Sequence, residues 1–315
     1  AWWLPSGHLQ TLWPALFRRI PSPEVVRERV ELADGDFLDL DWAAEGPPAG
    51  PIALLLHGLE GSLRSHYLPG LMRALAARGW RPVLMYHRGC SGEPNRLARR
   101  YNAADTRDLE WVVAHLRAAH PDAPLAAVGF SLGGNLLLKW LGEQGSGAPL
   151  AAAAAVSPPF RLERAADRLE AGLSRLYQAY LLDSLRRGLV RKRAERPDAC
   201  PLGPEETRGL RTFRAFDDAF TAPVHGYRDA AEYYRLGSCR PYLEAIRVPT
   251  LIVHALDDPF TTPDAAPGPG EVAEPVTLEL LPRGGHVGFV AGPIPGRGRY
   301  WLEERIPAFL AEGKA

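Results

Sequence analysis

A series of short apolar runs, each the length of one strand, constrains the fold of this chain most. At nearly every position these runs are apolar, which is typical of strands buried on both faces of a sheet. Helical patterns separate several of them. This alternation predicts a mostly parallel α/β sheet with helices on its faces. The runs are Pro51–Leu56, Pro82–Tyr86, Leu125–Phe130, Leu150–Val156 and Pro249–Ala255, and the helical patterns are Tyr67–Arg78, Ala104–Ala119 and Leu132–Leu141.

An alternating pattern of apolar and polar residues precedes the first of these runs. Val25–Leu32 and Phe37–Trp42 flank the turn Asp34-Gly35-Asp36. Two alternating runs about such a turn predict an N-terminal β-hairpin. The run Val276–Leu281 predicts one further strand near the C-terminus.

Residues 158–234 interrupt the alternation of strands and helices. They begin with the Arg- and Leu-rich helical stretch Leu162–Arg193, continue through a Pro/Gly loop at Cys200–Pro204, and end in a segment rich in Phe and Tyr. So many aromatic side chains need a surface to bury against. We therefore predict a helical cap insertion at about 160–234, within a single domain, that covers one end of the sheet. A solvated helical excursion is the alternative.

Composition excludes several classes of function. The 315 residues are 46% hydrophobic, and their 37 basic and 37 acidic side chains give a net charge of zero, so no overall field attracts nucleic acid or anionic membranes. No apolar run reaches the roughly 18 residues of a membrane-spanning helix, and the first residues lack the features of a signal peptide. The three cysteines are too sparse for a disulfide framework and favour a reducing cytoplasm.

The motif most indicative of chemistry directly follows the run Leu125–Phe130. The segment Gly129-Phe130-Ser131-Leu132-Gly133 has the pattern Gly-x-Ser-x-Gly, and a helical pattern comes next. Between a strand and a helix this pattern predicts a nucleophile elbow, a tight turn with an exposed serine hydroxyl at its tip. Side chains two residues either side of the serine would collide, so these positions need glycine. Ser131 is therefore the predicted nucleophile.

A serine hydroxyl needs a base to take its proton and a carboxylate to orient that base. Two later strand ends supply candidates, the pair Asp257-Asp258 before Pro259 and His286 after Gly284-Gly285. The order Ser131, Asp258, His286 along the chain is that of the α/β-hydrolases. Asp257 is the alternative acid, although Pro259 presents Asp258 more rigidly.

An acyl transfer also needs hydrogen-bond donors for the developing oxyanion. The run Pro51–Leu56 ends in His57-Gly58-Leu59-Glu60-Gly61, where glycines let backbone N–H groups approach a substrate. We assign the donors to the backbone N–H groups of Leu59 and Leu132. We expect His57 to be structural and Glu60 to face outward.

Other polar and aromatic residues are interpreted as structural. His87–Arg96 follows a strand end and is expected to be a hydrogen-bonded loop; in the alternative, Arg96, Arg99 or Arg100 meets an anionic substrate group. Cys90 is interpreted as a packed thiol and His254 as a core histidine. Some aromatic residues near the N-terminus suit either packing or contact with a bilayer surface, and we expect packing. These are Trp2, Trp3, Trp13 and Phe17.

Several segments together resemble the YheT-type α/β-hydrolases, a family related to the eukaryotic ABHD1/2/3 group, over essentially the whole chain. The resemblance implies ester hydrolysis in bacterial members and lipid or acyl ester substrates in eukaryotic relatives. It places the nucleophile on Ser131, the acid on Asp258 and the base on His286. The eukaryotic relatives carry an N-terminal membrane anchor that these residues do not show, which argues against membrane-embedded substrates. The segments are His8–Pro14, His57–Gly61, Arg88–Arg96, Gly129–Gly134, Ala255–Pro259 and Gly284–Phe289.

We expect an α/β-hydrolase fold, with a mostly parallel central sheet, an N-terminal β-hairpin and a helical cap, that acts as a serine esterase on small-molecule esters. Neither a metal nor an organic cofactor is implied. An acyltransferase using the same acyl-enzyme and a non-catalytic binding protein are the alternatives, although a pure binder has no use for a strained elbow.

Overall fold

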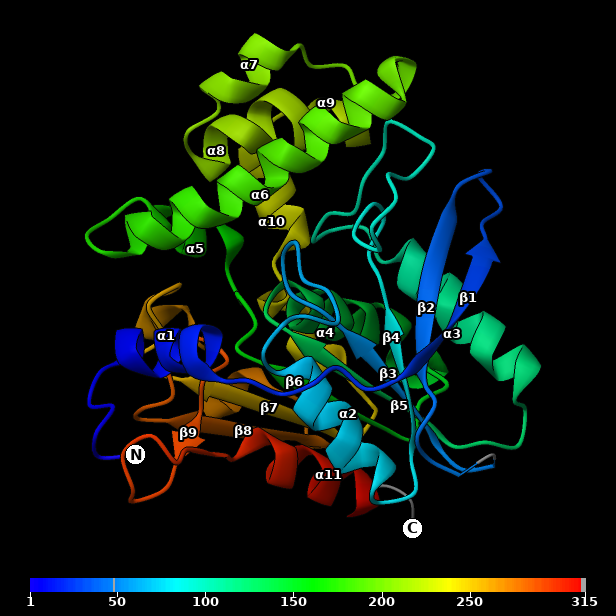
Figure 1. Cartoon of the computed structure of the whole chain (residues 1–315), viewed down its shortest axis with the longest axis vertical. Coiled ribbons are helices and arrows are strands. Elements are labelled where there is room, and N and C mark those ends of the chain that lie inside the picture. The colour runs from blue at the N-terminus through cyan, green and yellow to red at the C-terminus, as the bar shows by residue number, and fades with distance from the viewer. Residues whose placement is uncertain (48, 313–315) are drawn as a thin grey trace.

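The computed structural model describes residues 1–47 and 49–312 (Figure 1). Its centre is an eight-stranded sheet in the order β1-β2-β4-β3-β5-β6-β7-β8. All neighbouring pairs from β4 to β8 are parallel, whereas β1–β2 and β2–β4 are antiparallel. The predicted mostly parallel sheet with an N-terminal hairpin is confirmed. The strands are β1 Val25–Glu31, β2 Phe37–Ala43, β3 Ile52–Leu56, β4 Arg81–Met85, β5 Leu125–Phe130, β6 Ala152–Val156, β7 Thr250–Ala255 and β8 Val276–Leu281.

Helices cover both faces of the sheet. Every residue of β3, β5, β6 and β7 is buried, as their nearly continuous apolar runs predict. Successive side chains of β3 point to opposite faces of the sheet. Leu54 and Leu56 pack in the core between the sheet and helices α3 and α4, and Leu55 packs in the core between the sheet and helices α2 and α11. The bounds are α2 Leu68–Ala76, α3 Arg107–Ala119, α4 Leu132–Gln144 and α11 Leu302–Glu312.

The interval between β6 and β7 holds further helices, which lie above the sheet in Figure 1. The stretch predicted as helical, Leu162–Arg193, contains two helices, α5 and α6, and Gly172 between them has a φ of +54°. Aromatic residues of the interval are buried, including Phe216, Phe220, Tyr233 and Tyr234. The helices are α5 Leu162–Leu169, α6 Ser174–Glu195, α7 Pro204–Gly209, α8 Phe213–Phe216, α9 Ala222–His225 and α10 Ala230–Gly237, with a π-helical turn at Asp217–Thr221.

The N-terminal helix α1, Gly7–Phe17, was not expected from the sequence. It packs so closely that a Cβ on Gly7 would lie 1.8 Å from the backbone oxygen of Asp257. Trp3 and Trp13 pack edge to face with ring centroids 4.8 Å apart, as expected. Phe17 also packs on Trp13, with ring centroids 4.7 Å apart, but is 62% exposed. Trp2 is 70% exposed, and its indole N–H donates a hydrogen bond of 2.8 Å to the Pro293 carbonyl.

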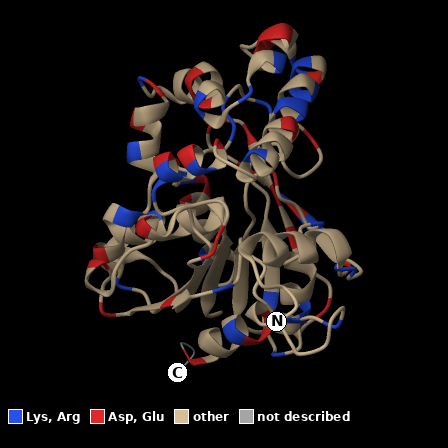
Figure 2. Cartoon of the chain, turned by 90° about the vertical axis from the view of Figure 1, so that its left-hand side faces the viewer, with Lys and Arg blue, Asp and Glu red and all other residues tan. Residues whose placement is uncertain are grey.

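Minor elements complete the chain. A two-stranded sheet pairs β9, Val290–Ala291, with β10, Arg299–Tyr300. Acidic and basic residues are interspersed along the helices in Figure 2, in keeping with the net charge of zero. Short 3-10 helices lie at Gly145–Gly147, Pro197–Ala199, Arg240–Ala245, Pro263–Ala265 and Pro269–Glu271.

Candidate active site

Ser131 lies at a sharp turn between β5 and α4. Its backbone has φ 51° and ψ −118°, a strained conformation for a residue with a side chain. A Cβ on Gly129 would lie 2.4 Å from the carbonyl oxygen of Gly133, and one on Gly133 would lie 2.6 Å from that of His57. The turn is possible only with glycine at these positions, which is the steric requirement that the motif predicted.

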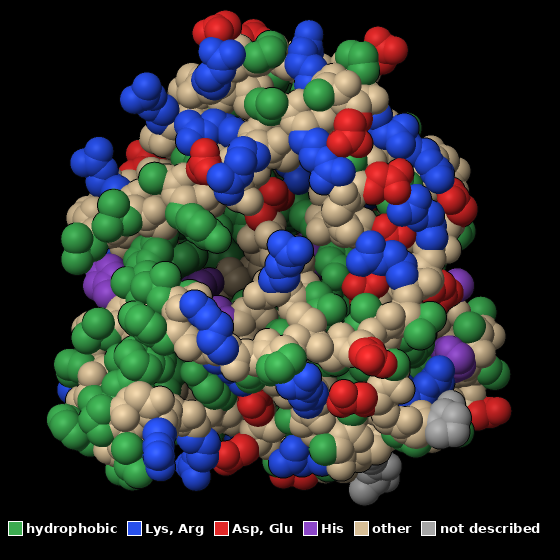
Figure 3. Space-filling model, viewed as in Figure 1, with side chains coloured by type: hydrophobic (Ala, Val, Ile, Leu, Met, Phe, Trp, Pro, Cys, Tyr) green, Lys and Arg blue, Asp and Glu red, His purple; other side chains and the backbone are tan. Residues whose placement is uncertain are grey.

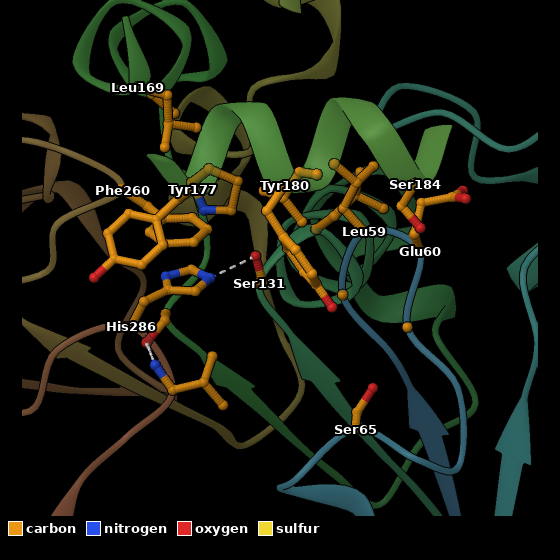
Figure 4. Close-up of a pocket in the computed structure, with 18 of the residues that line it drawn as sticks. Leu59, Glu60, Ser65, Ser131, Leu169, Tyr177, Tyr180, Ser184, Phe260 and His286 are labelled. Carbon is orange, nitrogen blue, oxygen red and sulfur yellow. Dashed lines mark hydrogen bonds between the residues drawn. The ribbon is translucent and has the colours of Figure 1, made fainter. Parts of the chain in front are cut away.

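The structure brings Ser131, His286 and Asp258 into one hydrogen-bonded chain (Figure 4). His286 Nδ1 lies 2.8 Å from Asp258 Oδ2, and His286 Nε2 lies 2.9 Å from Ser131 Oγ. A carboxylate can only accept hydrogen bonds, so His286 Nδ1 carries the proton. Nε2 then accepts the hydrogen bond that the Ser131 hydroxyl donates.

Asp258 is held as a carboxylate despite its burial. Its side chain is 1% exposed, and its other oxygen accepts a hydrogen bond of 2.8 Å from the backbone N–H of Phe260. Burial alone would raise the pKa of Asp258, but His286, His254 and the Phe260 N–H together outweigh this effect, and the net result is a lowered pKa. The Phe260 ring also stacks on His286 at 3.9 Å between centroids, which limits rotation of the imidazole.

Asp257, the alternative acid, has a different set of partners. Its Oδ1 accepts hydrogen bonds of 2.9 Å from the backbone N–H groups of Gly284 and Gly285. Asp257 therefore shapes the loop that carries His286, whereas Asp258 is the acid that contacts the imidazole. The sequence favoured Asp258 only through the rigidity that Pro259 imposes, and the partners of each acid come from the tertiary structure.

Helix α1 holds the His286 loop from the outside. Thr11 Oγ1 accepts a hydrogen bond of 2.8 Å from the backbone N–H of His286 and donates one of 2.7 Å to the Gly7 carbonyl. Gln10 Oε1 accepts from the backbone N–H of Val290 at 2.8 Å. Sequence reasoning missed this role; the signal available was the His8–Pro14 segment, which is part of the family resemblance.

The two amides proposed as oxyanion donors flank Ser131. Leu132 is the first residue of α4, and a Cβ on Gly58 would lie 3.1 Å from that of Ser131. The N–H of Gly58 donates to the Tyr67 hydroxyl and that of Glu60 donates to the Tyr101 hydroxyl. Within residues 1–47 and 49–312 no acceptor receives the N–H of Leu59 or of Leu132. Both amides thus remain available to a substrate oxygen.

Glu60 does not face outward, so that expectation was wrong. Its Oε1 accepts hydrogen bonds of 2.9 Å from Arg100 and 2.7 Å from the Tyr101 hydroxyl, and only 11% of its side chain is exposed. The buried guanidinium of Arg100 needs this carboxylate, because an unpaired charge there would lack its hydration. The backbone of the loop that carries Leu59 is anchored by the same contacts.

The arginines of the neighbouring loop are all paired with acids. Arg96 pairs with Glu31, Arg99 with Asp105, and Arg100 with Glu60. The loop is thus the hydrogen-bonded structure that was expected, and it does not leave these side chains free for an anionic substrate group. Cys90 is packed beside Glu60, and burial raises the pKa of its thiol.

His57 and His254 lie outside the hydrogen-bonded chain, and both are buried. His57 accepts at Nε2 from the backbone N–H of His87 at 3.1 Å, and burial holds its pKa well below the usual value. His254 is 1% exposed and packs edge-on against Phe160. Both fit the structural roles that were expected of them.

Ser131 and His286 lie in a cavity of about 910 Å³. Tyr177 and Phe260 lie on the His286 side of Ser131, and Leu59 lies on the other side (Figure 4). The rest of the wall is largely apolar and comes from α1, α5, α6 and the segments around α8 and α10. It includes Leu12, Leu16, Leu162, Leu169, Leu173, Leu176, Tyr180, Phe213, Phe216 and Phe220.

Comparison with known proteins decides the family. The family described as alpha/beta hydrolase fold matches residues 51–293. YheT of Escherichia coli (strain K12) is 45% identical over 96% of this chain and 89% of its own length. The chain belongs to the YheT-type α/β-hydrolases. Phospholipase ABHD3 of Homo sapiens is 32% identical over 95% of this hydrolase and 75% of its own length.

The solved structures agree on the fold. The esterase Pf2001 of Pyrococcus furiosus superposes with a TM-score of 0.59 at 16% identity, covering 92% of each chain. The predicted α/β-hydrolase fold and the family resemblance are therefore both confirmed, and this hydrolase is an enzyme of the esterase and lipase type.

None of the helices in residues 1–47 and 49–312 combines the length and apolar character needed to cross a membrane. In the same part of the chain, no cluster of three or more His, Cys, Asp or Glu side chains could hold a metal ion.

Proposed function

We propose that this hydrolase is a serine esterase that cleaves carboxylic esters through an acyl-enzyme on Ser131. One observation carries the proposal: Ser131, His286 and Asp258 form a hydrogen-bonded chain, with distances of 2.9 and 2.8 Å, inside a largely apolar cavity. This is the arrangement that activates a serine hydroxyl as a nucleophile.

In the first half of the reaction, Ser131 Oγ attacks the ester carbonyl carbon while its proton passes to His286 Nε2. Asp258 stabilises the imidazolium that forms, and the N–H groups of Leu59 and Leu132 donate to the oxyanion. When the tetrahedral intermediate collapses, His286 returns the proton to the departing alcohol. The acyl group is then bound to Ser131 as an ester.

In the second half, water replaces the alcohol. His286 Nε2 takes a proton from the water as its oxygen attacks the acyl carbon, the same two amides hold the oxyanion, and the proton then passes to Ser131 Oγ. The carboxylic acid leaves and the free serine is restored. An alcohol or thiol in place of water would make the protein an acyltransferase by the same steps.

The cavity supports an acyl or lipid-like substrate of short to medium chain length. Its volume of about 910 Å³ and its many Leu, Phe and Tyr side chains suit an alkyl chain better than a polar group. Phospholipase ABHD3 is by its name an enzyme that acts on phospholipids, which agrees with an acyl ester.

Two further features belong to this proposal. The segment at about 160–234 acts as a cap on the site within a single domain, because its helices supply much of the cavity wall. The protein works in the reducing cytoplasm, because Cys90, Cys200 and Cys239 are all free thiols.

The test compares wild type with Ser131→Ala on p-nitrophenyl esters of increasing acyl length. We expect the substitution to lower kcat by about 10³-fold or more, and a fluorophosphonate probe, located by mass spectrometry, to label Ser131. The acyl length that is hydrolysed fastest indicates the length of chain that the cavity accommodates. Labelling without hydrolysis, with products of transfer to an added alcohol, would favour the acyltransferase; absence of labelling would favour the binding protein.

A further inference from the structure

Two helix faces at the mouth of the cavity carry exposed apolar stripes. On α1 the stripe is Leu9, Leu12 and Leu16, which are 38–53% exposed, and at the start of α6 it is Leu173, Leu176 and Tyr180, which are 64–73% exposed. Both sets follow the spacing i, i+3, i+7 and thus lie on one face of each helix. Apolar side chains that are exposed singly are ordinary, but adjoining stripes are typical of an interaction surface.

The two stripes belong to one surface, because α1 and α6 touch. His8 Nδ1 lies 3.0 Å from the Tyr177 hydroxyl, and the two rings stack at 5.7 Å between centroids. We call this the mouth surface and define it as Leu9, Leu12, Leu16, Phe17, Leu173, Leu176 and Tyr180. Figure 3 shows apolar side chains gathered around a hollow on this side of the molecule.

The mouth surface continues into the cavity. Five of its seven residues, all except Leu9 and Phe17, also line the cavity that contains Ser131. An acyl chain entering by this route would stay in contact with apolar side chains from the surface to the cavity. A second copy of the chain seated here would instead cover the entrance.

The charges at the entrance are cationic. Arg19 and Arg64 are exposed and line the cavity, and no acid of the described residues pairs with either. Three acids also line the cavity, Glu60, Asp217 and Asp258. All three are largely buried, and each accepts hydrogen bonds from neighbouring protein groups. An apolar surface with arginines beside it complements a bilayer that contains anionic lipids.

We propose that the mouth surface docks on the surface of a phospholipid bilayer containing anionic lipids, so that the cavity opens against the lipid. The docking is peripheral: Leu, Phe and Tyr side chains enter the head-group region while the arginines meet lipid phosphates. The inference rests on the proposed function in one respect, because the entrance matters only if Ser131 receives an acyl substrate through it.

The test is co-sedimentation of the full chain with vesicles of phosphatidylcholine, with and without phosphatidylglycerol. We expect wild type to bind the vesicles that contain phosphatidylglycerol, and to bind phosphatidylcholine alone less. The double variant Leu9→Glu/Phe17→Glu should lower the partition coefficient by about tenfold or more. Both residues are exposed and neither lines the cavity, so hydrolysis of a soluble short-chain ester should be unchanged.

The matched control is Val26→Glu/Trp111→Glu. It makes the same change of charge at residues that are 64% and 42% exposed on β1 and α3, away from the mouth surface, and should bind vesicles as wild type does (Figure 1). Vesicle binding that is absent in wild type, or equal in both double variants, would overturn the proposal. So would a dimer in light scattering that only the Leu9/Phe17 variant dissociates. Fluorophosphonate labelling of each sample tests the esterase separately.

Discussion

Asp257 and Asp258 show how adjacent, chemically identical residues acquire different roles. The backbone turns after β7, so one carboxylate points to the amides of Gly284 and Gly285 and the other to the imidazole of His286. Both acids support the same histidine. Asp257 shapes its loop, while Asp258 sets its tautomer.

This division of roles predicts different effects of two substitutions. Asp258→Asn should lower kcat by about 10⁴-fold, because an amide can no longer favour the required tautomer. Asp257→Asn should lower kcat by less than about tenfold, since its side-chain oxygen still accepts both N–H groups. Steady-state kinetics on one p-nitrophenyl ester measures both variants. If Asp257→Asn is the more damaging change, the assignment of the acid is wrong.

Helix α1 acts as an external support for the site. Its backbone touches the turn after β7, and its side chains hydrogen-bond the loop that carries His286. That loop needs support, because Val287 and Phe289 both have positive φ values, 58° and 42°, that are rare for residues with large side chains. Contacts from a distant part of the chain offset this strain.

Thr11 therefore qualifies as a positioning residue. Thr11→Val removes the hydroxyl that receives the His286 N–H and should lower kcat by about 10–100-fold through misplacement of the imidazole, with KM little changed. Thr11→Ser keeps the hydroxyl and should retain activity near that of wild type. Separate kcat and KM values for the two variants check this. A fall in thermal stability with unchanged kcat in Thr11→Val would assign the residue a purely structural role.

At the scale of the whole molecule, the helices between β6 and β7 contact the rest of the protein through buried polar groups as well as apolar ones. Lys192 of α6 donates to Asn95 Oδ1 at 2.7 Å and to the Leu97 carbonyl, and its side chain is buried. Burial lowers the pKa of Lys192 to about 8, and nearby Arg100 adds to the effect. The two hydrogen bonds do not need the third proton of the ammonium group.

This contact predicts a pH-dependent stability. The folded state loses the Lys192 proton near pH 8, whereas the unfolded state keeps it to the ordinary value of 10.5, so the unfolded state binds more protons between these values. The free energy of unfolding of wild type should therefore rise with pH from 8 to 10, by roughly 1–2 kcal/mol relative to Lys192→Met. Urea unfolding of both proteins at several pH values measures the difference. If the free energy of unfolding of wild type and of Lys192→Met changed equally with pH, the prediction would be wrong.

Much of the fold could be predicted because its signals are local. A strand buried on both faces is apolar at nearly every position, so the runs around Leu54, Val128 and Ile252 identify central strands without any knowledge of their neighbours. The elbow is equally local, since a turn around Ser131 requires glycine on both sides. These features follow from sterics and burial over a few residues.

The sequence by itself thus determined the central strands, the elbow and candidates for each member of the hydrogen-bonded chain. The tertiary structure alone decided which of Asp257 and Asp258 meets His286, that Glu60 turns inward to Arg100, and that α1 supports the histidine loop. Each of these depends on contacts between residues distant in the chain, 275 positions apart for Thr11 and His286. The local sequence allows the side chains of Asp257, Asp258 and Glu60 to point in several directions. The partners that pack against each side chain select one of them.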